Sequence, residues 1–177
     1  MLKERDSLSK DEIFYRSEKS KHLFSLPQYT HSKTLMFFAS IKSEVFTHDM
    51  IREALEKKQI AVPKVVDKQI EPGLIIDFDS LVESEDFGVP EPTDLMQVAH
   101  KNIDLVVVPG AVFDKQGHRI GYGFGYYDKF LAKVPKALKV GLCFDFQLVD
   151  KIPNESHDVP VDFVITDREV VECKNSK

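Results

Sequence analysis

Several apolar runs along the chain have the length and the β-branched content of buried strands. They cover residues 34–40, 60–63, 103–108, 138–144 and 163–166. The run at 103–108 is almost continuous in apolar residues, which is typical of a central strand in a parallel sheet. A further segment, 73–78, is compatible with a strand, although the prolines and acidic residues around it mark loops.

Helical patterns alternate with these runs. Ser9 and Glu12 have the spacing of a capping box, and the helical pattern that follows closes at Pro27. A second pattern, 47–58, begins with a threonine that can cap it. A third pattern, 126–133, follows a group of glycines. The sequence therefore predicts helices between most of the expected strands.

This alternation predicts an α/β fold, a three-layer α/β/α sandwich with a mostly parallel central sheet, built from residues 1–177 as one domain. In such sheets, ligands bind at the carboxyl ends of the strands. The loops that follow residues 40, 63, 108 and 144 should therefore share one edge. We expect them to bring 42–47, the glycine loop and 145–160 around one cleft.

Composition narrows the class of protein. The 177 residues are 42% hydrophobic and carry a formal net charge of -5, which is typical of a soluble globular protein and argues against a general nucleic-acid binder. No apolar run approaches the ~20 residues of a membrane helix. Cys143 and Cys173 lack metal-site spacing, so we expect two unpaired cysteines in a reducing cytoplasm. We expect a cytoplasmic monomer or weak homodimer with no membrane or nucleic-acid partner.

The candidate chemistry gathers in a G-x-G-x-G loop at residues 121–125. Its spacing matches neither a Walker A loop nor the G-x-G-x-x-G dinucleotide fingerprint. The spacing alone is equally compatible with a tight turn and with an anion site. Arg119, just before the loop, favours the anion site because a guanidinium beside exposed N–H groups suits a phosphate.

Two acids near this loop have alternative interpretations. Asp128 lies in the first turn of the predicted helix, where it either complements the helix dipole or binds Mg²⁺ beside phosphates. Asp158, two residues before Pro160, is either a turn residue or a second Mg²⁺ ligand. His118 and His157 lack the spacing of metal ligands.

Aromatic residues are dense in and after the loop, at Tyr122, Phe124, Tyr126 and Tyr127. They either pack the loop onto the sheet or form a flat surface for a heterocycle such as a pterin or adenine. Glu44, taken alone, has the pattern of a solvated loop acid.

The run V-P-G-A-V-F-D-K-Q-G-H-R-I-G-Y-G-F-G-Y-Y-D-K-F-L, from Val108 to Leu131, resembles the signature of the 5-formyltetrahydrofolate cyclo-ligase family. The family pattern is close to P-G-x-x-F-D-x-x-G-x-R-x-G-x-G-x-G-Y-Y-D. Matches in the same order elsewhere are S-E-V-F-T at 43–47, Pro63-Lys64, Glu91-Pro92, Gln147 and 157–162. The resemblance therefore spans nearly the whole chain.

The resemblance implies an ATP- and Mg²⁺-dependent enzyme that converts 5-formyltetrahydrofolate into 5,10-methenyltetrahydrofolate and releases ADP and phosphate. Two alternatives stay open. The chain is a non-catalytic relative that binds folate or nucleotide, or an enzyme that acts on another formylated pterin. In all three cases, the expected partner is a small molecule.

The resemblance also implies roles for individual residues. The ATP site is expected to contain Lys3, Arg119, Ile120, Gly121, Tyr122, Gly123, Phe124, Gly125, Tyr126 and Tyr127. The substrate site is expected to contain Ala39, Ile41, Glu44, Tyr122, Gly123, Phe124, Gly125 and Tyr126. The Mg²⁺ ligands are expected to be Asp128 and Asp158, and the catalytic residues Arg119, Tyr126 and Asp128.

The chain departs from the family pattern at two places. Many members begin with a K-x-x-[LI]-R element whose lysine helps to bind ATP, and here only Lys3 and Arg5 stand in that region. The position of Phe124 often holds glycine or a basic residue in the family, and phenylalanine brings no charge to a phosphate. These departures are the reason for keeping the alternatives.

Overall fold

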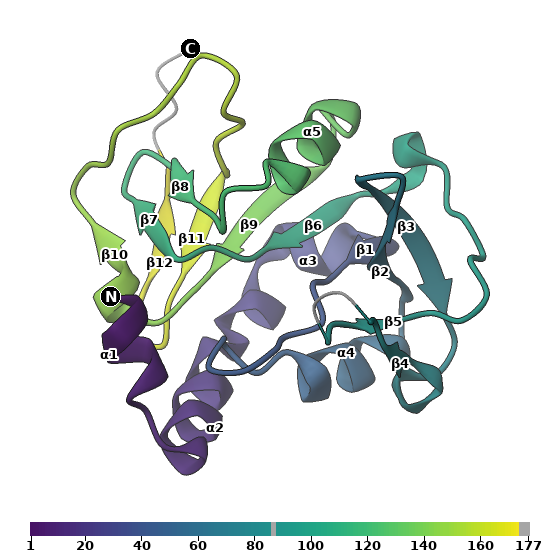
Figure 1. The fold of residues 1–177 in the computed structure, drawn as a ribbon, viewed down its shortest axis with the longest axis horizontal. Coiled ribbons are helices and arrows are strands. Elements are labelled where there is room, and N and C mark those ends of the chain that lie inside the picture. The colour runs from purple at the N-terminus through teal and green to yellow at the C-terminus, as the bar shows by residue number, and fades with distance from the viewer. Residues whose placement is uncertain (86–87, 174–177) are drawn as a thin grey trace.

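The centre of the computed structural model, which describes residues 1–85 and 88–173, is a seven-stranded sheet in the order β12-β11-β9-β6-β1-β2-β3 (Figure 1). The strands are β1 (Thr34–Met36), β2 (Gln59–Val66), β3 (Gln69–Ile75), β6 (Leu105–Val108), β9 (Leu138–Leu142), β11 (Phe163–Ile165) and β12 (Val170–Glu172). Neighbours from β11 to β2 pair in parallel, and only the edge strands β3 and β12 are antiparallel. The mostly parallel sheet is confirmed.

Helices cover both faces of this sheet (Figure 1). They are α1 (Leu2–Asp6), α2 (Lys10–Lys19), α3 (Pro27–His31), α4 (His48–Leu55) and α5 (Tyr126–Lys133), with 3-10 turns η1 (Ser20–Ser25), η2 (Phe78–Ser80), η3 (His100–Asn102) and η4 (Asp145–Gln147). The α4 side chain Ile51 belongs to one core cluster and the α5 side chain Phe130 to another. The three-layer arrangement is therefore confirmed.

Small sheets lie outside the central one. One contains β7 (Val112–Asp114), β8 (Arg119–Ile120) and β10 (Leu148–Val149), and the other contains β4 (Val82–Glu83) and β5 (Pro90–Glu91). Phe113 of β7 shares a core cluster with α5, so the first small sheet lies on the α5 side.

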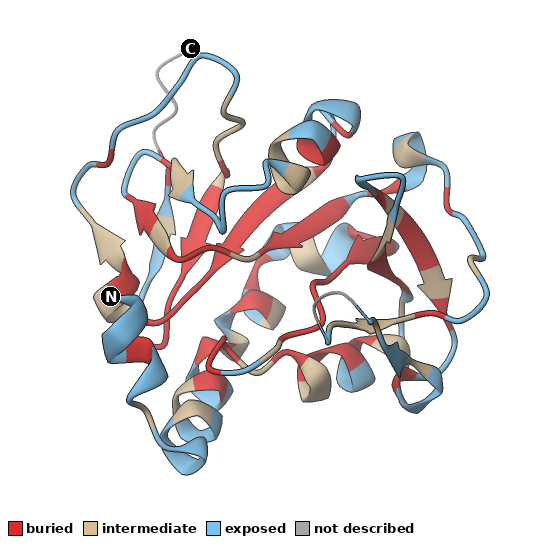
Figure 2. Ribbon diagram, viewed as in Figure 1, coloured by how far each residue is buried: buried red, intermediate tan, exposed pale blue. Residues whose placement is uncertain are grey.

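Alternation along the strands divides the core between the two faces of the sheet. Leu105 and Val107 belong to the cluster under α4, whereas Val106 and Val108 belong to the cluster under α5. Figure 2 shows the central strands buried along most of their length. Full burial of one such side chain stabilises the fold by roughly 1.5–3 kcal/mol. A strand such as β6, which is apolar at every position, therefore buries side chains on both faces, as a strand at the centre of the sheet does.

The helix predicted to close at Pro27 is divided into two pieces, α2 and η1, and η1 ends at Ser25. Its start is as predicted, because the Glu12 N–H donates to Ser9 Oγ at 3.2 Å and the Ser9 N–H donates to Glu12 Oε2 at 2.9 Å. Pro27 begins α3. The N–H of the first helical residue makes no intrahelical hydrogen bond, so a proline loses nothing at that position.

Thr47 precedes α4 as predicted but does not cap it with its side chain. Its Oγ1 donates to the Phe38 carbonyl at 2.8 Å and accepts the Ser40 N–H at 3.0 Å. The run predicted as a strand over 34–40 forms a strand only over Thr34–Met36. The two bonds to Thr47 fix the backbone of the residues that follow, at Phe38 and Ser40.

The strand predicted to end at Pro63 continues to Val66 and turns back into β3. Pro63 lies opposite Pro72 in this antiparallel pair. Asp67 and Lys68 form the connecting turn with φ of 49° and 60°, as in a type I′ hairpin turn. The predicted strand over 73–78 overlaps β3 only at residues 73–75, and Phe78 begins η2.

No helix in the described ranges 1–85 and 88–173 is long and apolar enough to cross a membrane. The loops that follow β1 and β6 leave the same edge of the sheet, because these strands are parallel neighbours. The loop after β1 carries Glu44, and the chain after β6 reaches the glycine loop.

Candidate functional site

The glycine loop connects β8 to α5 and lies open to solvent. Gly123 and Gly125 have φ of 92° and 64°, in the region that glycine adopts most easily, and Gly125 is the N-cap of α5. No side chain caps this helix, so N–H groups of its first turn remain without intrahelical partners. A Cβ atom added at Gly121, Gly123 or Gly125 would meet nothing within 4 Å. The loop therefore has room and donors for an anion.

Arg119 and Asp128 form an ion pair beside this loop. Arg119 Nη2 donates to Asp128 Oδ1 at 2.7 Å, and Arg119 Nη1 donates to the Val159 carbonyl at 2.8 Å. Asp128 Oδ1 also accepts the Val159 N–H at 3.3 Å. The Arg119 side chain is 4% exposed. These bonds join β8, the first turn of α5 and the 145–160 segment.

Asp158 is adjacent in sequence to Val159, whose N–H is bound to Asp128. Its Oδ2 accepts the Glu155 N–H at 2.8 Å, and its Oδ1 is 3.7 Å from His157 Nε2. In the part of the chain that the structure describes, no group of three or more His, Cys, Asp or Glu side chains could hold a metal ion. Mg²⁺ beside phosphates typically uses only one or two carboxylates, with phosphate and water oxygens completing its shell. Asp128 and Asp158 are carboxylates of the kind that such an ion prefers, and the Val159 N–H on Asp128 Oδ1 links the two segments that carry them.

Glu44 is buried rather than solvated, which corrects the interpretation of Glu44 taken alone. Its Oε2 accepts the Ile41 N–H at 3.0 Å, and its Oε1 accepts the Tyr122 hydroxyl at 2.9 Å. Burial raises the pKa of Glu44, and these hydrogen bonds with the charges of Arg5 and Lys42 oppose part of that rise. The bond to Tyr122 brings the loop after β1 to the glycine loop.

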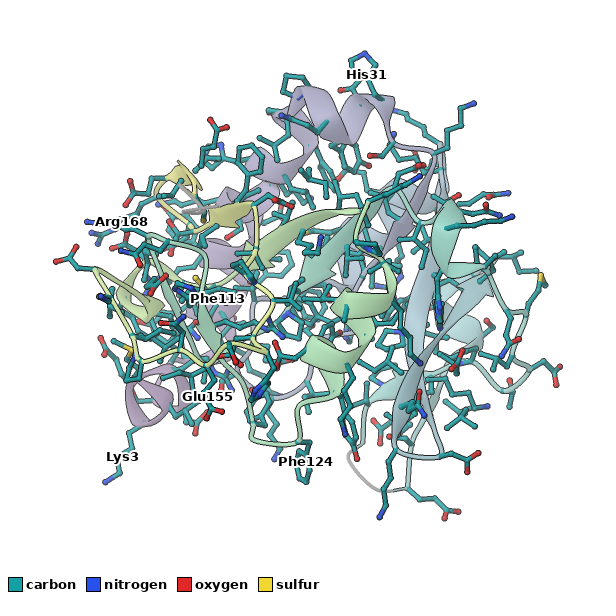
Figure 3. All side chains as sticks on the ribbon, turned by 90° about the horizontal axis from the view of Figure 1, so that it is seen from above. Lys3, His31, Phe113, Phe124, Glu155 and Arg168 are labelled. Atoms are coloured by element: carbon teal, nitrogen blue, oxygen red, sulfur yellow. The ribbon has the colours of Figure 1, made fainter. Side chains whose placement is uncertain are left out.

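Arg5 enters this cluster from α1. Its Nη2 donates to the Tyr122 hydroxyl at 2.9 Å and its Nε to Ser43 Oγ at 3.1 Å. Only 4% of Arg5 is exposed, whereas Lys3 is exposed and extends away from the molecule (Figure 3). The basic residue of α1 that lies at this site is therefore Arg5 and not Lys3. No local pattern marks Arg5, because its contact with Tyr122 joins residues 117 positions apart.

A cavity of about 10 Å³ lies beside Glu44, bordered by Arg5, Phe38 and Gly110. Ala39 and Ile41 do not border it. Ala39 is buried in the core cluster under α4, and Ile41 contributes its backbone N–H to Glu44.

Gln147 fixes the far wall of this cavity. Its buried amide donates to the Gly110 and Ala111 carbonyls at 3.2 and 2.9 Å, and its Oε1 accepts the Phe144 N–H at 3.0 Å. These bonds tie the chain after β6 to the chain after β9, so the wall is rigid.

The loop aromatics divide into two kinds. Phe124 and Tyr126 stack at 5.5 Å between ring centroids with an interplanar angle of 12°, and Phe124 is 56% exposed at the edge of the molecule (Figure 3). Tyr127 is packed between both core clusters, and its buried hydroxyl has no hydrogen-bond partner among the described residues. The first pair offers a flat surface, and Tyr127 offers an unused polar atom.

A concavity of about 450 Å³ lies elsewhere, where α3 approaches the start of β9. Some of its polar groups are already used within the fold. Asp104 accepts the Lys33 and Thr34 N–H groups at 2.7 and 2.9 Å, and Lys139 Nζ donates to the Ala137 carbonyl at 3.0 Å. None of the candidate site residues borders this concavity.

Comparison with known proteins agrees with this geometry. The chain is 31% identical over 159 residues to a probable 5-formyltetrahydrofolate cyclo-ligase of Caenorhabditis elegans, covering 81% of this chain and 77% of that protein. It is 30% identical to 5-formyltetrahydrofolate cyclo-ligase of Mus musculus, covering 78% and 75% of the two chains.

Solved structures agree as well. The 5,10-methenyltetrahydrofolate synthetase of Aquifex aeolicus superposes with a TM-score of 0.88 at 34% identity, covering 99% of this chain and 90% of that one. That of Mycoplasma pneumoniae superposes with a TM-score of 0.73 at 25% identity, covering 94% of each chain. The sequence pattern of the 5-formyltetrahydrofolate cyclo-ligase family matches residues 1–167. The chain therefore belongs to the 5-formyltetrahydrofolate cyclo-ligase family.

Proposed function

We propose that residues 1–177 act as one cyclo-ligase domain that converts 5-formyltetrahydrofolate into 5,10-methenyltetrahydrofolate, with ATP consumed and ADP and phosphate released. The observation that carries this function is the bond between Glu44 and Tyr122, which places a buried carboxylate directly beside an open glycine loop. One site can then hold a pterin and a triphosphate side by side. Unpaired Cys143 and Cys173 fit a reducing compartment, so we propose that the enzyme is cytoplasmic.

The chemistry explains why both ligands must meet. A formamide oxygen is a poor leaving group, and transfer of the γ-phosphoryl group to that oxygen makes the carbon electrophilic. Attack by N10 then closes the ring, and phosphate leaves. In such phosphoryl transfers, the protein mainly positions the reactants and neutralises charge.

The residues divide this work. Backbone N–H groups of the glycine loop and the first turn of α5 would bind the phosphates. Asp128 and Asp158 would hold Mg²⁺, which supplies positive charge against the phosphate oxygens. Arg119 holds Asp128 in place through the 2.7 Å ion pair.

At the other end of the site, Glu44 would accept hydrogen bonds from the N–H groups of the pterin. Its burial strengthens such bonds. The stacked pair of Phe124 and Tyr126 would flank the heterocycle.

The test is an activity assay of the purified protein with 5-formyltetrahydrofolate and MgATP. Formation of the methenyl product is followed by absorbance, and ADP release is measured in parallel. Expected results are equal amounts of both products and loss of turnover when EDTA removes the divalent cation. A folded protein that forms neither product contradicts this function.

A second candidate is a non-catalytic folate-binding relative, which is favoured by Phe124, because this exposed loop residue brings no charge to a phosphate. Calorimetry separates the two. Binding of 5-formyltetrahydrofolate without any response to ATP would select the binding protein. Turnover of a different formylated pterin, and none of 5-formyltetrahydrofolate, would select a related enzyme.

A further inference from the structure

The Tyr122 hydroxyl forms hydrogen bonds with two groups of the site at once. It donates to Glu44 Oε1 at 2.9 Å and accepts from Arg5 Nη2 at 2.9 Å. The Arg5 guanidinium also lies 5.9 Å from the centroid of the Tyr122 ring. A buried carboxylate that would receive a substrate and a buried cation from α1 are therefore both engaged by one side chain of the protein.

Arg5 is buried without a direct anionic partner. No carboxylate among the described residues lies within ion-pair distance of its guanidinium, and only 4% of the residue is exposed. Its Nε donates to the Ser43 hydroxyl, which in turn donates to Asp6, and its Nη2 donates to the Tyr122 hydroxyl, which in turn donates to Glu44. Carboxylates therefore reach Arg5 only through intervening hydroxyls. A buried cation is costly unless an anion compensates it. This arrangement favours binding of an anion at Arg5.

The cavity beside Glu44 is too small for a pterin. Its volume of about 10 Å³ is near the minimum for a single water molecule, whereas ligand pockets are typically about 300–1,000 Å³. Tyr122 binds two residues of its border, Arg5 and Glu44, but is itself 52% exposed, and its neighbours Gly121 and Gly123 have open space around them. Tyr122 can therefore swing outward without displacing packed atoms of the core.

We propose that Tyr122 is a latch that blocks Glu44 in the ligand-free protein, and that a phosphoryl group of the nucleotide releases it by taking its place on Arg5. This latch rests on the proposed function, because it takes Glu44 as the pterin anchor. It makes Arg5 a residue of the phosphate site and couples the two ligands. Nucleotide binding then raises the affinity for the folate and, by linkage, the folate raises the affinity for the nucleotide.

The latch is tested first without ligand, by hydrogen exchange of the full chain and of its Tyr122→Phe variant. The variant keeps the ring but loses both hydrogen bonds. We expect the amides of α1 and of residues 120–125 to exchange several-fold faster, and the β6 amides to be unchanged. Tyr15→Phe, which alters an exposed tyrosine under Lys19, is the matched control. Unchanged exchange in Tyr122→Phe would overturn the latch whether or not any ligand binds.

Calorimetry with 5-formyltetrahydrofolate then tests the coupling, with and without a non-hydrolysable ATP analogue and Mg²⁺. In the unaltered protein, we expect the analogue to tighten folate binding by about tenfold, the equivalent of one typical net hydrogen bond. Tyr122→Phe should bind the folate about tenfold tighter without nucleotide and show little further gain with it. Arg5→Gln should lose the nucleotide effect, and exposed Arg168→Gln should keep it.

The outcomes separate this latch from the proposed function. Turnover with no change of folate affinity in Tyr122→Phe would contradict the latch and leave the cyclo-ligase assignment in place. Weaker folate binding in Tyr122→Phe would make its hydroxyl a substrate contact instead of a block. Faster exchange in Tyr122→Phe, together with no turnover of 5-formyltetrahydrofolate, would retain the latch and remove the assigned reaction.

Discussion

Arg119 and Asp128 form an ion pair of 2.7 Å across the glycine loop, so the proposed Mg²⁺ ligand is held by a side chain from the opposite end of that loop. The oxygen that accepts from Arg119 also accepts the Val159 N–H. A residue fixed in this way loses little entropy when it binds an ion, which is how an enzyme pre-organises a site.

Asp128→Asn is expected to lower both turnover and stability. The isosteric amide removes the charge that binds Mg²⁺ and leaves the buried Arg119 without its carboxylate. We expect kcat to fall at least about 100-fold, as for other lost charge-stabilising groups. Stability should fall by about 2 kcal/mol, less than for a fully buried pair because Asp128 is 25% exposed. Steady-state kinetics and thermal unfolding measure both, and retained turnover would remove Asp128 from the metal site.

The control for this variant is Asp150→Asn. Asp150 pairs with Lys115 at 2.7 Å, but its side chain is 89% exposed. Exposed pairs contribute little to stability because water screens them. The melting temperature and kcat of Asp150→Asn should therefore stay close to those of the unaltered protein.

Glu44→Gln should stabilise the protein while it weakens substrate binding. Burial raises the pKa of Glu44, so the folded state holds its proton more tightly than the unfolded state. Its contribution to stability therefore falls as pH rises from the ordinary value of 4.5 through the raised value. The glutamine variant lacks this loss, so its advantage in melting temperature should grow with pH across that window.

Thermal unfolding of Glu44→Gln is measured at several pH values, with the exposed Glu56→Gln as the control. An advantage that does not change with pH would contradict the buried, ionisable carboxylate. Affinity for 5-formyltetrahydrofolate should fall by about tenfold to a hundredfold, because hydrogen bonds to a charged acceptor are replaced by weaker ones.

The sequence predicted the central layer of the fold better than its edges. Residues 103–108 are apolar except at Asp104, a pattern typical of a central strand, and the structure has β6 at Leu105–Val108, buried on both faces. Pro63 was wrongly predicted to end a strand. Its partner across the hairpin is Pro72, so neither residue has to donate a backbone N–H to the other at that point. The hairpin turn at Asp67 and Lys68 lacks the glycine that usually marks it.

The candidate site was predictable where it is local in sequence and not where it depends on tertiary contacts. The glycines between Arg119 and Asp128 form one continuous motif, and their order alone places them around a helix N-terminus. Arg5 gives no such signal, because burial of its guanidinium depends on Ser43 and Tyr122, which only folding brings near.

Gly117→Ala and Gly121→Ala should separate folding from binding. Gly117 has a φ of 90°, and a Cβ there would lie 2.2 Å from the Val161 carbonyl oxygen, so alanine should cost at least about 2 kcal/mol. A Cβ at Gly121 meets nothing within 4 Å, so stability should change by less than about 0.5 kcal/mol. That methyl group would, however, stand in the proposed phosphate site.

Thermal unfolding and the KM for ATP measure this pair of glycine variants. We expect Gly117→Ala to lower the melting temperature by about 4 °C or more, at about 2–4 °C per kcal/mol for a chain of this size. Gly121→Ala should melt normally and show a raised KM for ATP. An unchanged KM in Gly121→Ala would indicate that the phosphates bind elsewhere.

Tyr127→Phe should make the protein more stable and the enzyme worse. The Tyr127 hydroxyl is buried without a hydrogen-bond partner among the described residues, and burial raises its pKa strongly. Removing an unsatisfied polar atom while keeping the ring should stabilise the fold by about 1 kcal/mol. If this hydroxyl bonds the nucleotide in the complex, the same change should raise the KM for ATP several-fold, whereas Tyr15→Phe at an exposed position should change neither quantity. A lower melting temperature for Tyr127→Phe would show that the hydroxyl already has a partner, such as a bound water, in the ligand-free protein.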